Sequence, residues 1–149
     1  MKARRTRKAR RRDPLTPEQR SYTMARVRAQ DTTPELTVRR LAHRMGYRYR
    51  LHGRDLPGHP DMVFPARRKV IFVHGCFWHG HDCAAGENRP ASNRRYWTRK
   101  LRLNQARDAA NEKRLRELGW ESLVVWECEL RLVPRVARRI ADFLEGGRG

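Results

Sequence analysis

The protein is 149 residues long, enough for one domain with a single hydrophobic core. Its 35 lysine and arginine residues outnumber 16 aspartate and glutamate residues, which gives a formal net charge of +19. So large an excess of positive charge requires a polyanionic partner, and it favours a nucleic acid over an anionic membrane surface. No apolar run reaches the ~18 residues of a membrane-spanning helix, and the basic amino terminus lacks the apolar segment of a signal peptide, so we expect a cytoplasmic protein.

Residues 1–20 consist largely of charged side chains, with two prolines and no apolar stripe. This composition predicts a disordered basic arm, followed by a folded domain over residues 21–149. Two roles are open for the arm: it follows the phosphates of a nucleic acid, or it is a solubilising tail without specific contacts.

The first folded elements are predicted from Thr33 onwards. Thr33 can cap a helix whose first position is Pro34, and Gly46 ends this helix. Three short extended segments follow, over 47–51, 61–64 and 69–73. In the first of them, aromatic or aliphatic residues alternate with arginine, which is typical of a half-buried strand.

The second half of the chain is predicted to alternate between helix and strand. Residues 84–92 contain glycine and proline and are predicted to form a loop. A long helix is predicted over 93–118 and a buried strand over 120–126. A last amphipathic helix begins at Pro134, and its core face comprises Val136, Ile140, Phe143 and Leu144. This order of elements predicts an α/β fold in which a small mixed sheet is flanked by helices.

The three cysteines of the chain lie in two places. Cys76 and Cys83 share a ten-residue segment with three histidines, and Cys128 follows a distant apolar run. Three cysteines and one histidine form a soft, closed ligand set of the kind that holds structural zinc in a tetrahedral site. Either His81 or His79 can complete the set. The alternative is three unrelated buried thiols, and the odd number of cysteines argues against a disulfide framework.

Asp61 follows a Pro-Gly turn and begins an extended segment. A carboxylate presented at the edge of a sheet in this way can hold Mg²⁺. A phosphodiesterase uses that ion to neutralise charge on the phosphoryl and leaving-group oxygens. Ordinary turn chemistry also explains a Pro-Asp pair at such a position.

The long predicted helix has an apolar stripe that is interrupted by polar residues. Trp97 and Leu115 lie toward its apolar ends, while Asn104 and Asp108 occupy its middle. An unpaired buried carboxylate is costly, so Asp108 is expected to meet a buried partner or a polar cleft. His79 is the expected partner because an aspartate orients an imidazole that takes a proton from water. The alternative is a polar face that is exposed where the packing is interrupted.

Phe77 and Trp78 lie between the candidate metal ligands, in a loop too short to bury both rings. Exposed aromatic side chains on a basic protein can wedge between base steps or stack on flipped bases. The alternative is that the two rings cover the zinc site as a small satellite core.

Taken together, these features resemble the very short patch repair (Vsr) family of DNA mismatch endonucleases. The most specific part is the combination His-Gly-Cys-Phe-Trp-His-x-His-x-Cys with a late Trp-Glu-Cys. The matching segments are 24–27, 31–35, 56–61, 70–83, 117–120 and 124–128, within roughly residues 20–145. The resemblance implies a restriction-endonuclease-like α/β core and Mg²⁺-dependent nicking of one strand beside a T:G mismatch.

The resemblance also implies partners and a cellular setting. T:G mismatches arise when 5-methylcytosine deaminates, so a DNA cytosine methyltransferase and a repair polymerase are functional partners of such a nickase. The implied protein is a monomer in the bacterial cytoplasm, associated with the nucleoid, with no membrane partner. Its cofactors are a catalytic Mg²⁺ and a structural Zn²⁺.

The resemblance assigns catalytic roles to individual residues. Asp61 would hold Mg²⁺ together with the main-chain carbonyl of Val73. His79, oriented by Asp108, would activate the attacking water. The remaining residues that line this site are Glu35 and His74.

Zinc and DNA contacts are assigned in the same way. The zinc ligands would be Cys76, His81, Cys83 and Cys128. The residues inserted next to the mismatched pair would be Met24, Phe77 and Trp78. The further DNA contacts would be Trp97, Lys100 and Asn104.

The chain departs from the wider nuclease fold in one respect. Such nucleases carry an acid-x-Lys motif on the strand after the metal-binding aspartate, and Phe72-Val73-His74 replaces it here, as in the Vsr family. Two other functions stay open. One is a zinc-stapled DNA-binding module without catalysis, and the other is a nuclease of the same fold that acts as a restriction enzyme or on a different lesion.

Overall fold

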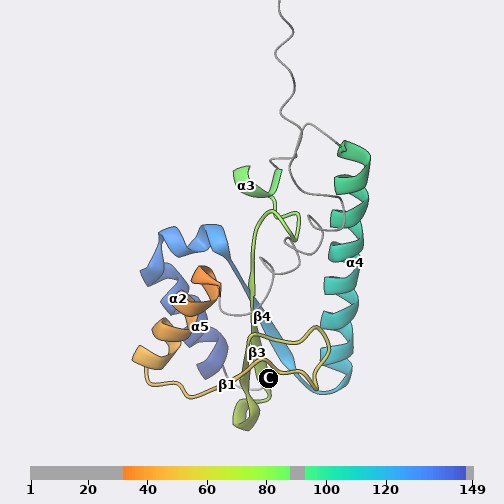
Figure 1. Ribbon diagram of the computed structural model, residues 1–149. Helices are drawn as coiled ribbons and strands as arrows, with labels where there is room; N and C mark the ends of the chain where they lie inside the picture. The colour runs from red at the N-terminus through yellow and green to blue at the C-terminus, as the bar shows by residue number, and fades with distance from the viewer. Residues whose placement is uncertain (1–31, 88–92, 147–149) are drawn as a thin grey trace, which may run out of the picture. The chain divides into compact units, whose positions relative to one another are not determined.

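The computed structural model describes residues 32–87 and 93–146. The predicted basic arm over 1–20, Met24 and residues 88–92 lie outside this part of the chain. A four-stranded sheet has helix α4 on one face and helices α2 and α5 on the other (Figure 1). The prediction of an α/β fold with a small mixed sheet flanked by helices is therefore confirmed.

The elements follow the predicted order, with three additions. The strands are β1 Arg50–Leu51, β2 Met62–Phe64, β3 Lys69–His74 and β4 Glu121–Trp126. The α-helices are α2 Thr33–Arg44, α3 Ala84–Glu87, α4 Arg94–Glu117 and α5 Val133–Glu145. The short 3-10 helices are η1 Pro65–Arg67 and η2 Glu127–Arg131. The additions to the prediction are α3 and the two 3-10 helices. No helix in the described ranges is long and apolar enough to cross a bilayer.

The sheet combines an antiparallel and a parallel part in the order β1-β2-β3-β4. β1, β2 and β3 pair antiparallel, and β4 joins β3 in parallel after the crossover through α4. The register pairs His74 with Trp126, the last residues of β3 and β4. Because parallel strands end at the same edge, the segments that follow these two residues leave the sheet side by side.

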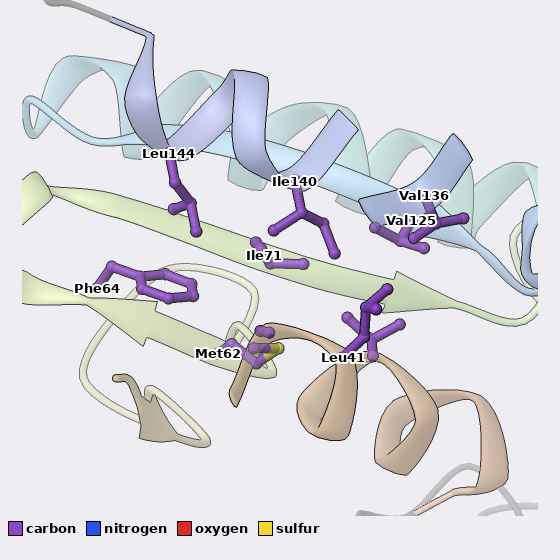
Figure 2. Close-up of a cluster of buried hydrophobic side chains, with 10 residues drawn as sticks. Leu41, Met62, Phe64, Ile71, Val125, Val136, Ile140 and Leu144 are labelled. Atoms are coloured by element: carbon purple, nitrogen blue, oxygen red, sulfur yellow. The ribbon is translucent and has the colours of Figure 1, made fainter. Parts of the chain in front are cut away.

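The main core lies between the sheet and the helices α2 and α5 (Figure 2). Its labelled side chains are Leu41, Met62, Phe64, Ile71, Val125, Val136, Ile140 and Leu144. The predicted core face of the last helix is confirmed, with Phe143 partly buried against the same cluster. On the opposite face, Leu115 of α4 packs with Val63 and Val70. α4 is thus held against β2 and β3, close to where those strands carry the polar residues described below.

A buried lysine fixes the end of α5. The Lys69 Nζ donates hydrogen bonds to the carbonyl oxygens of Phe143, at 2.5 Å, and Gly146, at 2.9 Å. A positive charge is stabilising at a helix carboxyl terminus, where carbonyl groups lack intrahelical partners. The first residue of β3 therefore secures the helix that covers the core.

The predicted strand over 47–51 is too long. Only Arg50 and Leu51 pair with β2. The Tyr47 N–H instead donates to the carbonyl of Ala42, at 3.0 Å, and so closes the end of α2. The Tyr49 hydroxyl donates to the main-chain carbonyl of Arg39 in α2 at 2.9 Å. These two tyrosines therefore anchor the segment to the helix, and tertiary contact overrides the local alternation.

The predicted loop over 84–92 is wrong for its first residues. Ala84–Glu87 form the short helix α3. The N–H of Gly86 donates to the sulfur of Cys83 at 3.4 Å, which closes a turn that the composition did not reveal. The rest of this segment lies outside the described residues.

Candidate functional site

The three cysteines meet one histidine at the edge of the sheet where β3 and β4 end. The ligand atoms of this cluster all lie within 4.8 Å of one another, and its members are Cys76, His81, Cys83 and Cys128. Cys76 lies two residues after the end of β3, and Cys128 lies in η2, which directly follows β4. The N–H of Cys128 donates to the sulfur of Cys76 at 3.4 Å. This donor set fits zinc, because soft sulfur ligands with one imidazole are typical of closed zinc sites.

The electrostatics of the cysteines also fit a cation. Burial raises the pKa of the Cys76 thiol to about 12. The hydrogen bond from the backbone N–H of Gly86 lowers the pKa of Cys83 to about 7. A buried thiolate such as that of Cys76 is costly unless a positive charge compensates it. A metal ion at the centre of the cluster would supply that charge.

Three further contacts order the segment that contains Cys128. The N–H of Trp126 donates to the carboxylate of Glu129 at 3.1 Å, and Arg139 of α5 pairs with the same carboxylate. The ring of Trp126 stacks on His81 with centroids 4.1 Å apart. Trp126 of β4 therefore packs against this cluster.

Gly86 is expected to be essential for the loop that carries His81 and Cys83. A Cβ atom at Gly86 would lie 1.8 Å from the main-chain oxygen of His81, so an alanine forces the loop to move. We expect Gly86→Ala to reduce the metal content and to lower the free energy of unfolding by about 1–3 kcal/mol. Metal analysis and thermal unfolding measure both, with the exposed Ala84→Gly as control. Parental metal content and stability would contradict this expectation.

A second cluster contains two histidines and an aspartate. The Nδ1 of His79 lies 2.5 Å from the Oδ2 of Asp108 in α4. The ring of His79 stacks on that of His74, with centroids 3.7 Å apart and an interplanar angle of 1°. The side chains of His79 and Asp108 are 20% and 32% exposed, so water can reach them. With Nδ1 donating to the carboxylate, Nε2 keeps the lone pair of a base.

His74 is a neutral member of this cluster. Burial lowers its pKa to about 4, and the neighbouring His79 adds to the effect. Within the described residues its buried Nδ1 has no hydrogen-bond partner. A buried polar atom without a partner costs free energy until water or a ligand meets it. This position next to the His79–Asp108 pair is therefore suited to a polar substrate group.

A third cluster contains Asp61, Glu35 and His52, with ligand atoms within 4.8 Å of one another. The Oδ2 of Asp61 accepts a hydrogen bond from the N–H of Val73 at 2.6 Å. Burial, together with the hydrogen bond that protonated Asp61 donates to Glu35, raises the pKa of Asp61 to about 8. Two adjacent carboxyl groups repel one another when both are ionised, and a divalent cation relieves that repulsion. The oxygen donors of this cluster fit Mg²⁺.

Asp61 and the His79–Asp108 pair belong to two neighbouring clusters. In the described part of the chain, no set of ligand atoms within 4.8 Å contains all three residues. β3 connects the clusters, because Val73 binds Asp61 and the next residue, His74, stacks on His79. The end of β3 thus places a carboxyl pair beside a water-accessible imidazole.

Two residues at this place were not predicted from the sequence: His52, a member of the third cluster, and Arg39, which contacts it. Arg39 forms an ion pair with Glu35 at 3.1 Å, and both side chains are less than one tenth exposed. The i, i+4 spacing of this pair on a predicted helix was an available signal. His52 follows the first predicted strand directly, but nothing in the local sequence indicates that it turns towards Asp61.

The aromatic side chains gather at the start of α4. Phe77, Trp78 and Trp97 lie with ring centroids 5.0–5.9 Å apart, and Phe77 and Trp78 are partly buried. Lys100 lies over the rings of Trp97 and Tyr96, 5.7 Å from each centroid. Tyr96 is 52% exposed and was not predicted as a site residue. The rings form an aromatic cluster between the loop after β3 and the start of α4.

Two consecutive residues of α4 hold the loop that carries His79. Asn104 is buried and donates to the main-chain oxygen of Trp78 at 2.9 Å. Gln105 donates to the main-chain oxygens of His79 and Gly80, at 3.4 and 3.1 Å. Asn104 was expected to contact DNA. In the structure it orders the loop between the aromatic cluster and His79.

Comparison with known proteins identifies relatives of the chain. A family model described as "DNA mismatch endonuclease Vsr" matches residues 12–85. The "Type II nicking enzyme V.XorIIP" of Xanthomonas oryzae pv. oryzae is 50% identical over 133 residues, which cover 89% of this chain and 97% of the relative. The "DNA mismatch endonuclease Vsr" of Escherichia coli is 42% identical over 112 residues, covering 75% and 71% of the two chains. The chain therefore belongs to the Vsr family of DNA mismatch endonucleases.

Proposed function

We propose that the protein nicks one strand of duplex DNA next to a T:G mismatch and so initiates very short patch repair. The observation that carries this proposal is the partly exposed His79–Asp108 pair, joined at 2.5 Å and placed beside the Asp61–Glu35 carboxyl pair by β3. Membership of a family of mismatch endonucleases supports the substrate, and relatives named as nicking enzymes support cleavage of a single strand.

His79 acts as the general base in this proposal. Its Nδ1 donates to Asp108, which leaves Nε2 to take a proton from the attacking water. The carboxylate of Asp108 orients the ring and stabilises the imidazolium that forms. His74 stacks against the base as a neutral ring and lines the site.

Asp61 and the main-chain carbonyl of Val73 would hold Mg²⁺, with Glu35 lining the site. Mg²⁺ supplies a positive charge that neutralises the phosphoryl and leaving-group oxygens during hydrolysis. Because only the main-chain oxygen of position 73 is required, a valine serves there. A cation at this place would offset the burial and the neighbouring Glu35 carboxyl group that raise the pKa of Asp61.

Further residues are proposed to bind zinc and to contact DNA around this centre. Zn²⁺ would bind Cys76, His81, Cys83 and Cys128, and with no open coordination position it would stabilise a restriction-endonuclease-like core. The DNA contacts would be Met24, Phe77, Trp78, Trp97, Lys100 and Asn104.

The basic arm over 1–20 would precede a domain over 21–149. The protein would act as a monomer in the bacterial nucleoid and serve genomes with a DNA cytosine methyltransferase, with a repair polymerase acting after it.

A panel of mispaired duplexes with varied flanking bases tests the proposed activity. We expect one cut on one strand of T:G duplexes, dependent on Mg²⁺, and no cutting of the fully paired duplex. Binding should weaken steeply with salt, because arginine contacts to phosphates release counterions. Equal cutting of paired and T:G duplexes would favour a restriction-type nuclease instead. Binding without any cutting would favour a DNA-binding module.

A further inference from the structure

A buried arginine links the carboxyl pair to a histidine that no proposed catalytic step uses. Arg39 of α2 is 8% exposed. One of its nitrogens, Nη2, lies 3.1 Å from the carboxylate of Glu35 and 3.1 Å from the Nε2 of His52. His52 in turn lies in one cluster with Glu35 and Asp61. Distance alone would allow His52 to be a third ligand of the metal.

The chemistry of the arginine contact decides against a ligand role. A guanidinium group has only N–H donors, so the Nε2 of His52 must accept with its lone pair. A neutral imidazole has one lone pair and one N–H, and the proton of His52 therefore lies on Nδ1. No ring nitrogen is left with a lone pair for a cation while the Arg39 contact persists.

The main chain of His52 also contacts the site. Its N–H donates to the carbonyl of Asp61 at 3.2 Å, which extends the β1–β2 ladder by one pair. The φ angle of His52 is +52°, a left-handed conformation that a side chain other than glycine adopts only when its surroundings hold it. One residue thus fixes the backbone of Asp61 directly and the carboxylate of Glu35 through Arg39.

We infer that His52 and Arg39 are positioning residues that hold the Asp61–Glu35 carboxyl pair from outside, and that the metal centre itself keeps oxygen ligands only. Arg39 also places a positive charge at a nuclease site whose acid-x-Lys motif is replaced by Phe72-Val73-His74. An all-oxygen site suits Mg²⁺ and Mn²⁺ and lacks the imidazole that favours later transition metals. This inference rests on the proposed metal site.

The tautomer of His52 is the first test. Long-range ¹H–¹⁵N spectra of the full chain at pH 8, without added Mg²⁺, should show the His52 proton on Nδ1, and adding Mg²⁺ should leave it there. In Arg39→Met the Nδ1 preference should be lost, whereas the exposed His43, the internal control, should be unchanged. A proton on Nε2 in the parent protein would overturn the inference.

Metal selectivity is the second test. Titration with Mn²⁺, followed by the electron paramagnetic resonance of the free ion and by competition with Mg²⁺, gives both affinities. In His52→Ala we expect both affinities to fall by a similar factor, so that their ratio stays within about twofold, while activity falls roughly 10–100-fold. His52→Gln should restore both affinities and activity, because its side-chain oxygen can accept from Arg39.

The outcomes separate this inference from the proposed metal site. A selective loss of Mn²⁺ affinity, about tenfold or more beyond that of Mg²⁺, in both His52 variants would identify His52 as a ligand and overturn the inference. Unchanged affinity and activity in His52→Ala would also overturn it. Parental Mn²⁺ binding in Asp61→Ala would instead refute the metal site, whatever the tautomer of His52.

Discussion

Replacing Asp61 with asparagine is expected to abolish nicking while making the protein more stable in the absence of Mg²⁺. The variant loses the carboxylate proposed to hold the metal, and a loss on the order of a thousandfold in rate corresponds to removing that charge stabilisation. An asparagine can still accept the hydrogen bond that the N–H of Val73 donates to Asp61. It also removes one member of a buried carboxyl pair, so the fold should be kept.

The stability of the parent protein without Mg²⁺ is expected to depend on pH through Asp61. The pKa of Asp61 is raised from 3.8 to about 8, chiefly by burial, so the folded protein binds this proton more tightly than the unfolded chain. The resulting stabilisation is complete below pH 3.8 and is lost as the pH rises towards about 8. The parent without Mg²⁺ should therefore lose stability across this window, and Asp61→Asn should lose less.

Single-turnover nicking of a T:G duplex and thermal unfolding at pH 5 and pH 9 measure the two effects. Asp55→Asn is the matched control, because Asp55 is an exposed aspartate of the same connection between β1 and β2. The interpretation fails if Asp61→Asn cuts at the parental rate. It fails equally if parent and variant show the same change of stability between the two pH values.

His81→Ala and His79→Ala are expected to have opposite effects although the residues are two positions apart. Without His81 the cysteine cluster loses one of its four ligands, so zinc should be released and the domain should lose several kcal/mol of stability. Without His79 the cysteine cluster keeps all its members, and the fold should remain. Nicking should then fall by roughly 10²–10⁴-fold, the usual contribution of a general base.

Zinc per chain by mass spectrometry, thermal unfolding and single-turnover nicking distinguish the two variants. Each variant serves as the control for the other, because each removes one imidazole from the same loop. Release of zinc by His79→Ala with retention by His81→Ala would require the two assignments to be exchanged. Parental nicking by His79→Ala would remove the general base from the proposal.

The parts of the fold that the sequence predicted are those with long or regular patterns. The helix over 93–118 and the strand over 120–126 were found because a helical period and a run of β-branched and apolar residues are local properties. The short helix α3 and the short strand β1 depend on contacts with residues distant in the chain, or on a sulfur acceptor, and no local pattern encodes them.

The candidate site was predicted in the same uneven way. The cysteine set followed from residue type, but the choice between His79 and His81 needed the position of Asp108 on α4. The pairing of His79 with Asp108 could be expected from the polar interruption in the helix face. The i, i+4 spacing of Glu35 and Arg39 indicates an ion pair, but sequence does not reveal which of the 35 lysine and arginine residues is buried.

The helix α4 touches both the aromatic cluster and the catalytic candidate. Trp97 lies near its start, Asn104 and Gln105 hold the loop of His79, and Asp108 binds the imidazole itself. These contacts span about 16 Å along a single rigid rod. If DNA displaces the ring of Trp97, α4 transmits that movement to Asp108, which binds the proposed general base His79. In the proposed function, α4 would therefore couple inspection of the base pairs to cutting of the strand.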